Sequence, residues 1–144
     1  MKNRIFCLLL LASTTLLAWS NNPLRAIQIV AEPNANQNSA TAMDIVFVYD
    51  PTALSLLPKT GPEWFAKKAT LAVGLGDAID TVSLQVPPAT LIDDVALPQR
   101  AKKALAVYCY ANYLTPSGQA MGNLTAYKQV RIRLQSETVG YEPY

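Results

Sequence analysis

The sequence predicts an all-β fold, a β-sandwich with one short helix inserted between its second and third strands. Three observations support this: most apolar runs alternate with a period of two, they are short and end at turn-forming residues, and a single segment has helical spacing. Two sheets would bury their inward rows of Val, Ile and Leu against each other. A chain of 144 residues has room for one such domain.

Residues 1–20 have the organisation of a secretory signal peptide, and residues 21–144 form the predicted domain. Lys2 and Arg4 give a basic start, an apolar run follows, and small residues occupy the −3 and −1 positions of a cleavage site after Ser20. The run is shorter than the roughly 20 apolar residues that a spanning helix needs, so we expect cleavage instead of an uncleaved anchor. The sequence therefore predicts export.

Short alternating or apolar runs predict the strands. Turn signals bound several of them: Asp50-Pro51 ends the second and Pro87-Pro88 ends the third. In chain order the predicted strands are 27–31, 44–49, 81–86, a weaker run over 90–97, 103–113 and 127–134. The second run is apolar on both faces, whereas the third and the last alternate between apolar and polar residues. The tail, residues 140–144, is either a final strand or a mobile end.

One segment has the spacing of a helix. Thr60 and Glu63 are placed as in a capping box, and Pro62 is tolerated in the first turn. The pattern predicts a helix over 63–73 that is anchored by Trp64 and Phe65 as core residues. Its predicted buried face comprises Phe65, Ala69 and Ala72, and its predicted stop comprises Gly74 and Gly76. Before it, residues 51–57 are expected to form a single turn.

The residue types present argue against catalysis, metal binding and cofactor binding. The chain has no His, and it has a formal charge of +2, which is too small for a nucleic-acid binder. Both excess charges belong to the predicted signal peptide, as does Cys7, so Cys109 remains alone in an apolar run and is expected to be a buried hydrophobe. Asp93-Asp94 are adjacent and point to opposite faces of an extended chain. We therefore expect no catalytic residue, no metal, no cofactor and no small-molecule substrate.

The order of these features resembles the TssJ family, the outer-membrane lipoproteins of the type VI secretion membrane complex. The residues that carry the resemblance are the polar loop 33–39, the strand 45–49, the aromatic pair Trp64-Phe65, the strand ending at Val86-Pro87, and the runs 105–113 and 127–134. The resemblance implies a transthyretin-like β-sandwich that performs no chemistry. It also implies docking, through the loop between the first two strands, onto the periplasmic C-terminal region of the inner-membrane protein TssM.

Carried onto this sequence, that loop covers residues 33–40. The partner-binding residues implied are Pro33, Asn34, Asn36, Asn38 and Ser39. Side-chain amides suit a wet interface because they both donate and accept hydrogen bonds. The expected location is the periplasm, with indirect membrane association, because Trp19 follows Leu16-Leu17-Ala18 where the family has its lipidated Cys.

Two further protein-binding functions fit the same sequence. One is a chaperone or pilotin-type protein of another envelope assembly, which would present an exposed sheet edge to a partner strand. The other is an inhibitor or immunity-type module, which would bind an enzyme through one protruding loop.

Overall fold

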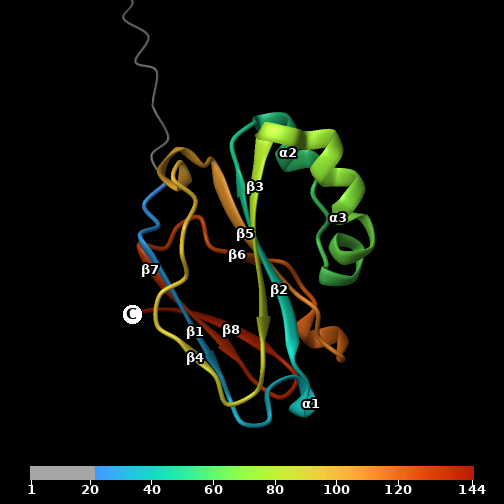
Figure 1. Cartoon of the computed structure of the whole chain (residues 1–144), viewed down its shortest axis with the longest axis vertical. Coiled ribbons are helices and arrows are strands. Elements are labelled where there is room, and N and C mark those ends of the chain that lie inside the picture. Colours follow the sequence, from blue (N-terminus) through green and yellow to red (C-terminus); the bar gives the residue numbers. More distant parts are fainter. Residues whose placement is uncertain (1–21) are drawn as a thin grey trace, which may run out of the picture.

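The fold is known from a computed structural model, which describes residues 22–144. Within this range eight strands form two four-stranded sheets that pack face to face (Figure 1). The first sheet has the order β4-β1-β7-β8, with β1 (Ala26–Ala31), β4 (Leu91–Ile92), β7 (Gln129–Leu134) and β8 (Val139–Pro143). The second has the order β3-β2-β5-β6, with β2 (Thr41–Val48), β3 (Ile79–Val86), β5 (Ala106–Ala111) and β6 (Gly122–Asn123). The predicted β-sandwich is confirmed.

The helices lie mainly in the connection between β2 and β3. They are α2 (Pro51–Leu56) and the longer α3 (Gly61–Leu75), whereas α1 (Ala35–Asn38) is a four-residue turn between β1 and β2. The Asp50 side chain caps α2 by accepting a hydrogen bond from the Thr52 amide at 2.7 Å. The Thr60 hydroxyl caps α3 by accepting from the Glu63 amide at 3.4 Å, as its spacing predicts.

Strand pairing joins distant parts of the chain. β2 lies antiparallel between β3 and β5, with Ile45 opposite both Val82 and Cys109. β1 and β7 run parallel, with Ile29 opposite Ile132, although about a hundred residues separate them in sequence. The tail forms β8, which pairs antiparallel with β7, so of the two alternatives for residues 140–144 the ordered strand is correct.

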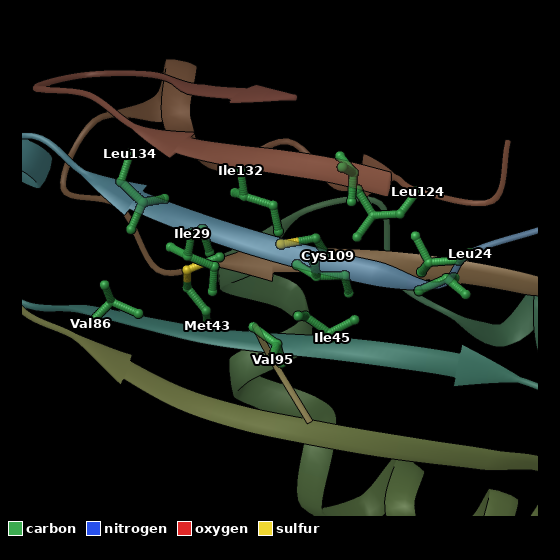
Figure 2. Packing of buried hydrophobic residues seen from close by; sticks show 14 of the residues in the cluster. Leu24, Ile29, Met43, Ile45, Val86, Val95, Cys109, Leu124, Ile132 and Leu134 are labelled. Atoms are coloured by element: carbon green, nitrogen blue, oxygen red, sulfur yellow. The ribbon is translucent and has the colours of Figure 1, made fainter. Parts of the chain in front are cut away.

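The main core lies between the two sheets (Figure 2). The predicted alternation in the last long strand is confirmed, because Val130, Ile132 and Leu134 are fully buried. Arg131 and Arg133 project from the other face and pair with Glu142 at 3.2 and 2.9 Å. Cys109 is buried in this core, as expected from its apolar surroundings in the sequence.

A second core covers the outer face of the β3-β2-β5-β6 sheet, and it explains why β2 is apolar on both faces. Its members come from that sheet and from α2 and α3: Val46, Val48, Ala53, Leu57, Trp64, Ile79, Ala106 and Tyr110. The Trp64 ring stacks on Tyr110, with centroids 4.8 Å apart and planes 9° from parallel. Trp64 is therefore the core anchor that its position predicts, and Phe65 is half-buried.

The predicted buried face of the helix is wrong. Ala69 and Ala72 are exposed, because the stripe of α3 that packs on the second core runs through Trp64, Leu71 and Leu75 instead. Gly61 and Trp64, in its first turn, are the fully buried residues of the helix. A Cβ at Gly61 would lie 2.5 Å from the Ala111 carbonyl oxygen, so only glycine permits this close approach. The predicted stop is shifted as well: Gly74 lies inside α3, and the helix ends at Gly76, whose φ is +48°.

Other boundaries differ from the sequence prediction. The run over 90–97 has strand pairing only at Leu91–Ile92, although Val95 packs in the core. The strand predicted over 103–113 begins at Ala106, because residues 101–103 form a 3-10 turn. The predicted signal peptide, with Cys7, lies outside the described residues. Over residues 22–144, no helix has the length and apolar character needed to cross a membrane.

Candidate functional site

The β1–β2 loop, which carries the predicted docking residues, is a left-handed turn. Three successive residues that are not glycine have positive φ: Asn36 at 47°, Gln37 at 54° and Asn38 at 61°. This conformation costs roughly 1–2 kcal/mol per residue for L-amino acids, and Asn tolerates it best because its short polar side chain can bond locally. The loop therefore has one unusual, specified shape, and such strain tends to occur at ligand-binding segments.

Asn36 holds this turn against the rest of the fold. Its side-chain Oδ1 accepts from the Leu114 amide at 2.8 Å, and its Nδ2 donates to the Asn112 carbonyl at 3.3 Å. Its backbone amide donates to the Gln135 carbonyl at 2.9 Å. With 2% of its surface exposed, Asn36 faces the protein interior. Its amide, named above as partner-binding, is used within the fold and shapes the loop around it.

The other predicted docking residues differ in exposure. Pro33, Asn34 and Asn38 are exposed, and Ser39 is half-buried. Gln37 is also exposed, between two asparagines in the left-handed run. The exposed polar side chains of the loop are thus those of Asn34, Gln37 and Asn38.

Two other segments meet this loop at the same end of the sandwich (Figure 1). The Gln37 amide donates to the Ser136 carbonyl at 3.1 Å, which ties the loop to the β7–β8 turn. The hydroxyls of Thr115 and Ser117 donate to the Glu137 carbonyl at 2.8 and 2.9 Å. We call these segments, residues 33–40, 114–117 and 136–137, the docking end, after the docking residues that the sequence predicts within it.

The docking end includes an exposed apolar residue that sequence reasoning missed. Leu114 is 61% exposed and lies beside Asn36, to which its amide is bonded. In sequence it directly follows the predicted strand 103–113, and no local pattern marks it as exposed. Tyr113, directly before it, is buried and donates its hydroxyl to the Gln135 carbonyl at 2.7 Å, and burial raises its pKa to about 12. The chain turns at this point, and the turn leaves Leu114 outside.

Cys109 and Asp80, two other groups with reactive side chains, are engaged within the fold. Burial raises the pKa of the Cys109 thiol to about 12, so the thiolate is suppressed at neutral pH. Asp80 accepts from Arg100 Nε at 2.9 Å and from the Tyr49 hydroxyl at 2.7 Å, and the Arg100 hydrogen bond lowers the pKa of that carboxyl. Asp93 and Asp94 are exposed. Over residues 22–144, no three His, Cys, Asp or Glu side chains come close enough together to hold a metal ion.

Solved structures share this architecture. The T6SS lipoprotein TssJ1 from Pseudomonas aeruginosa superposes with a TM-score of 0.61 at 14% identity, over 83% of this chain and 94% of that one. The chain has the fold of the TssJ lipoproteins. Serratia marcescens Lip, a membrane-bound component of the type VI secretion system, superposes with a TM-score of 0.59 at 9% identity, over 83% and 95%. The TssJ resemblance of the sequence and its transthyretin-like sandwich are confirmed at the level of fold.

A third solved structure has a similar fold. A chain in the structure of the T6SS protein TssM C-terminal domain (869–1107) from EAEC superposes with a TM-score of 0.54 at 14% identity, over 81% of this chain and 98% of that one. No protein-family model matches the sequence. No curated protein matches it either. The similarity to the TssJ lipoproteins is therefore clear in the fold, although few residues are identical.

Proposed function

We propose that this protein is a non-catalytic component of a type VI secretion membrane complex that docks onto the periplasmic C-terminal region of a TssM-like inner-membrane protein. The likeness to TssJ1 and Lip supports the proposal, because both are membrane-associated components of that system. The protein would act in the periplasm after export and reach the membranes through its partner.

The observation that carries the docking step is the specified shape of the β1–β2 loop. Asn36 and the backbone bonds to Gln135 and Ser136 fix the turn before any partner arrives. A loop that is already ordered loses little conformational entropy on binding, so more of its contact energy appears as affinity. It presents the amides of Asn34 and Asn38, which donate and accept, and its Asn36 holds the backbone of the exposed, apolar Leu114. An apolar centre with polar surroundings is typical of a protein interface.

The test is a calorimetric titration of the purified protein with the periplasmic C-terminal region of the TssM-like protein encoded in the same genome. We expect saturable binding, and we expect the double substitution Asn34→Ala and Asn38→Ala to weaken it roughly tenfold or more. Leu114→Ser should weaken it similarly, because it removes the exposed apolar contact. These side chains are exposed, so the substitutions should leave the fold intact, which thermal unfolding verifies.

A matched control is Asn123→Ala, which alters an exposed asparagine on β6, outside the docking end. It should bind like the unmodified protein. Absence of binding to the TssM-like region would contradict the proposed partner. Binding that is unchanged in both docking-end variants would instead show that another surface makes the contact.

A further inference from the structure

The β3-β2-β5-β6 sheet ends in a long strand whose outer edge is unpaired. β3 spans eight residues and pairs with β2 along its whole length in one uninterrupted register, from Ile79 opposite Val48 to Val86 opposite Thr41. Its other side borders no strand. Apart from the Ile79 amide, which donates to the Gly76 carbonyl where the strand begins, no hydrogen bond among residues 22–144 reaches the backbone of β3 from outside the β2 ladder. Alternate amides and carbonyls of this strand therefore face outward without a protein partner.

β3 lacks the features that normally protect an edge strand. Such strands are commonly short, bulged, interrupted by Pro, or decorated with Lys. β3 has no bulge, and its only charged side chain is Asp80, which is engaged by Arg100 and Tyr49. Its exposed residues are the small or neutral Thr81, Ser83 and Gln85. The edge is consequently open to pairing with another extended segment.

Side chains on both faces of the edge are arranged to receive such a segment. On the inward face Val82 and Leu84 are only partly buried. They pack against the main core, to which Ile92 of β4 in the opposite sheet and Leu97 also contribute. Apolar side chains at alternate positions of an added strand would cover these residues. An edge that offers both a backbone ladder and apolar cover on one face is a suitable acceptor for β-augmentation.

On the outward face a hollow of about 240 Å³ lies between β3 and α3. Thr81 and Ser83 form its strand side, and the exposed Ala69 and Ala72 form its helix side. Asp44, Trp64 and Lys68 line it as well. The mainly small or apolar lining fits a side chain from the outward face of the same added strand. In β-augmentation, backbone bonds supply affinity and hollows of this kind supply specificity.

A second hollow, of about 450 Å³, borders the same edge at Asp80 and Thr81, and its far wall is the segment 98–100. The edge is thus flanked by α3 on one side and by this segment on the other. A second copy of this sandwich would contact α3 and residues 98–100 before its own edge strand reached β3. A single extended segment, in contrast, fits between these two walls.

We propose that the free edge of β3 accepts an extended segment of a partner protein that carries apolar side chains at alternate positions. This site is separate from the docking end and does not depend on it.

The experiment uses a phage-displayed library of random linear peptides, selected against the purified protein. The enriched peptides should alternate apolar and polar residues, and a synthetic copy should slow amide hydrogen exchange within residues 79–86. Ser83→Lys puts a charge at the exposed edge and into the hollow, so it should weaken the peptide roughly tenfold or more. Gln85→Lys provides a second variant on the same strand if Ser83→Lys lowers stability. Gln129→Lys, an equal charge on the exposed Gln129 of the interior strand β7, should bind normally.

Several outcomes would overturn the proposal. Peptides without alternation, or protection at β6, β8 or the loop 33–40 instead of β3, would show that the edge is not the acceptor. Sedimentation analysis of the protein alone tests whether a second copy of the protein occupies the edge. A dimer that Ser83→Lys dissociates would show that β3 pairs with another copy of this chain and not with a partner protein. None of these results bears on binding of the TssM-like region to the docking end, so the two proposals fail independently.

Discussion

Trp64 donates its indole Nε1–H to Oδ2 of Asp44 at 2.7 Å, and both side chains are almost completely buried. Lys68 approaches the same oxygen at 2.9 Å from one helical turn further along α3. Asp44 lies on β2, in the middle of the sheet, so this carboxylate joins the helix to the sheet at a fixed point. The stacking of Trp64 on Tyr110 completes the junction.

Replacing Asp44 should detach this junction. Asp44→Ala leaves the buried indole N–H of Trp64 without an acceptor, and we expect the free energy of unfolding to fall by about 3 kcal/mol. Urea denaturation measures the change. Asp93→Ala, at an exposed carboxylate, is the control and should change stability by less than about 0.5 kcal/mol. Equal stability of the two variants would mean that the Asp44 contacts contribute nothing.

Asn36 should matter for stability, in contrast to the exposed asparagines beside it. Asn36→Ala removes both side-chain hydrogen bonds and leaves the Leu114 amide without its acceptor, at an expected cost of about 2 kcal/mol. Asn34→Ala removes an exposed side chain and should have almost no effect on unfolding. A comparison of the two urea midpoints checks this, and equal midpoints would contradict the structural role of Asn36.

Gln37 tests the left-handed backbone separately from side-chain contacts, because its side chain is exposed and its φ is 54°. Gln37→Val places a β-branched residue in this conformation and should destabilise the protein by about 1–2 kcal/mol. Glycine adopts positive φ without steric cost, so Gln37→Gly should leave the free energy of unfolding unchanged or raise it by up to about 1 kcal/mol. Thermal unfolding of both variants decides, and a valine variant as stable as the glycine variant would exclude a left-handed Gln37.

Two glycines should respond oppositely to alanine. A Cβ at Gly122 would lie 2.2 Å from the ζ carbon of Tyr141, so Gly122→Ala forces that ring to move and should cost about 1–3 kcal/mol. Gly74 lies within α3 with nothing within 4 Å of an added Cβ. Gly74→Ala should therefore stabilise the protein by about 0.5–1 kcal/mol through helix propensity. The pair is measured in parallel by chemical denaturation, and a tolerated alanine at Gly122 would contradict the close packing of Tyr141.

Alkaline pH should destabilise the protein. Burial raises the pKa of Cys109 from its usual value near 9 to about 12, and that of Tyr113 from 10 to about 12. Between about pH 9 and pH 12 the folded state keeps protons that the unfolded chain releases, so the free energy of unfolding decreases as pH rises. Urea titrations at several pH values in this window measure the slope. Cys109→Ala should flatten its lower part, and an unchanged slope in that variant would show that Cys109 is not involved.

The sequence predicted much of the fold because its strands are marked by local chemistry. Val130, Ile132 and Leu134 alternate strictly with two arginines, and this pattern is typical of a strand that buries one face and exposes the other. The capping pair Thr60 and Glu63 marks the start of α3 from four successive residues alone. The predicted buried face of that helix was wrong because the packed stripe runs through Trp64, Leu71 and Leu75, one position away from the stripe of Phe65, Ala69 and Ala72. Local spacing alone does not reveal which of two neighbouring stripes meets the sheet.

The docking end shows the same division. The sequence located the polar β1–β2 loop, since runs of Asn and Pro between strands are turn-forming. It did not separate Asn36, which is buried and bonded across the fold, from Asn34 and Asn38, which face solvent. The exposure of Leu114 was not predicted either, because only the tertiary structure places the residue after the predicted strand 103–113 beside Asn36.

By itself, the sequence determined the class of fold, the strand segments, the start of the inserted helix and the position of the polar loop. These follow from periods of a few residues and from the conformational limits of Pro, Gly and Asn. The tertiary structure alone decided the parallel pairing of β1 with β7, the role of Asn36 and the unpaired edge of β3. Each of these features depends on which distant segments become neighbours. The packing of the two whole sheets against each other sets those neighbours, and no local sequence pattern predicts it.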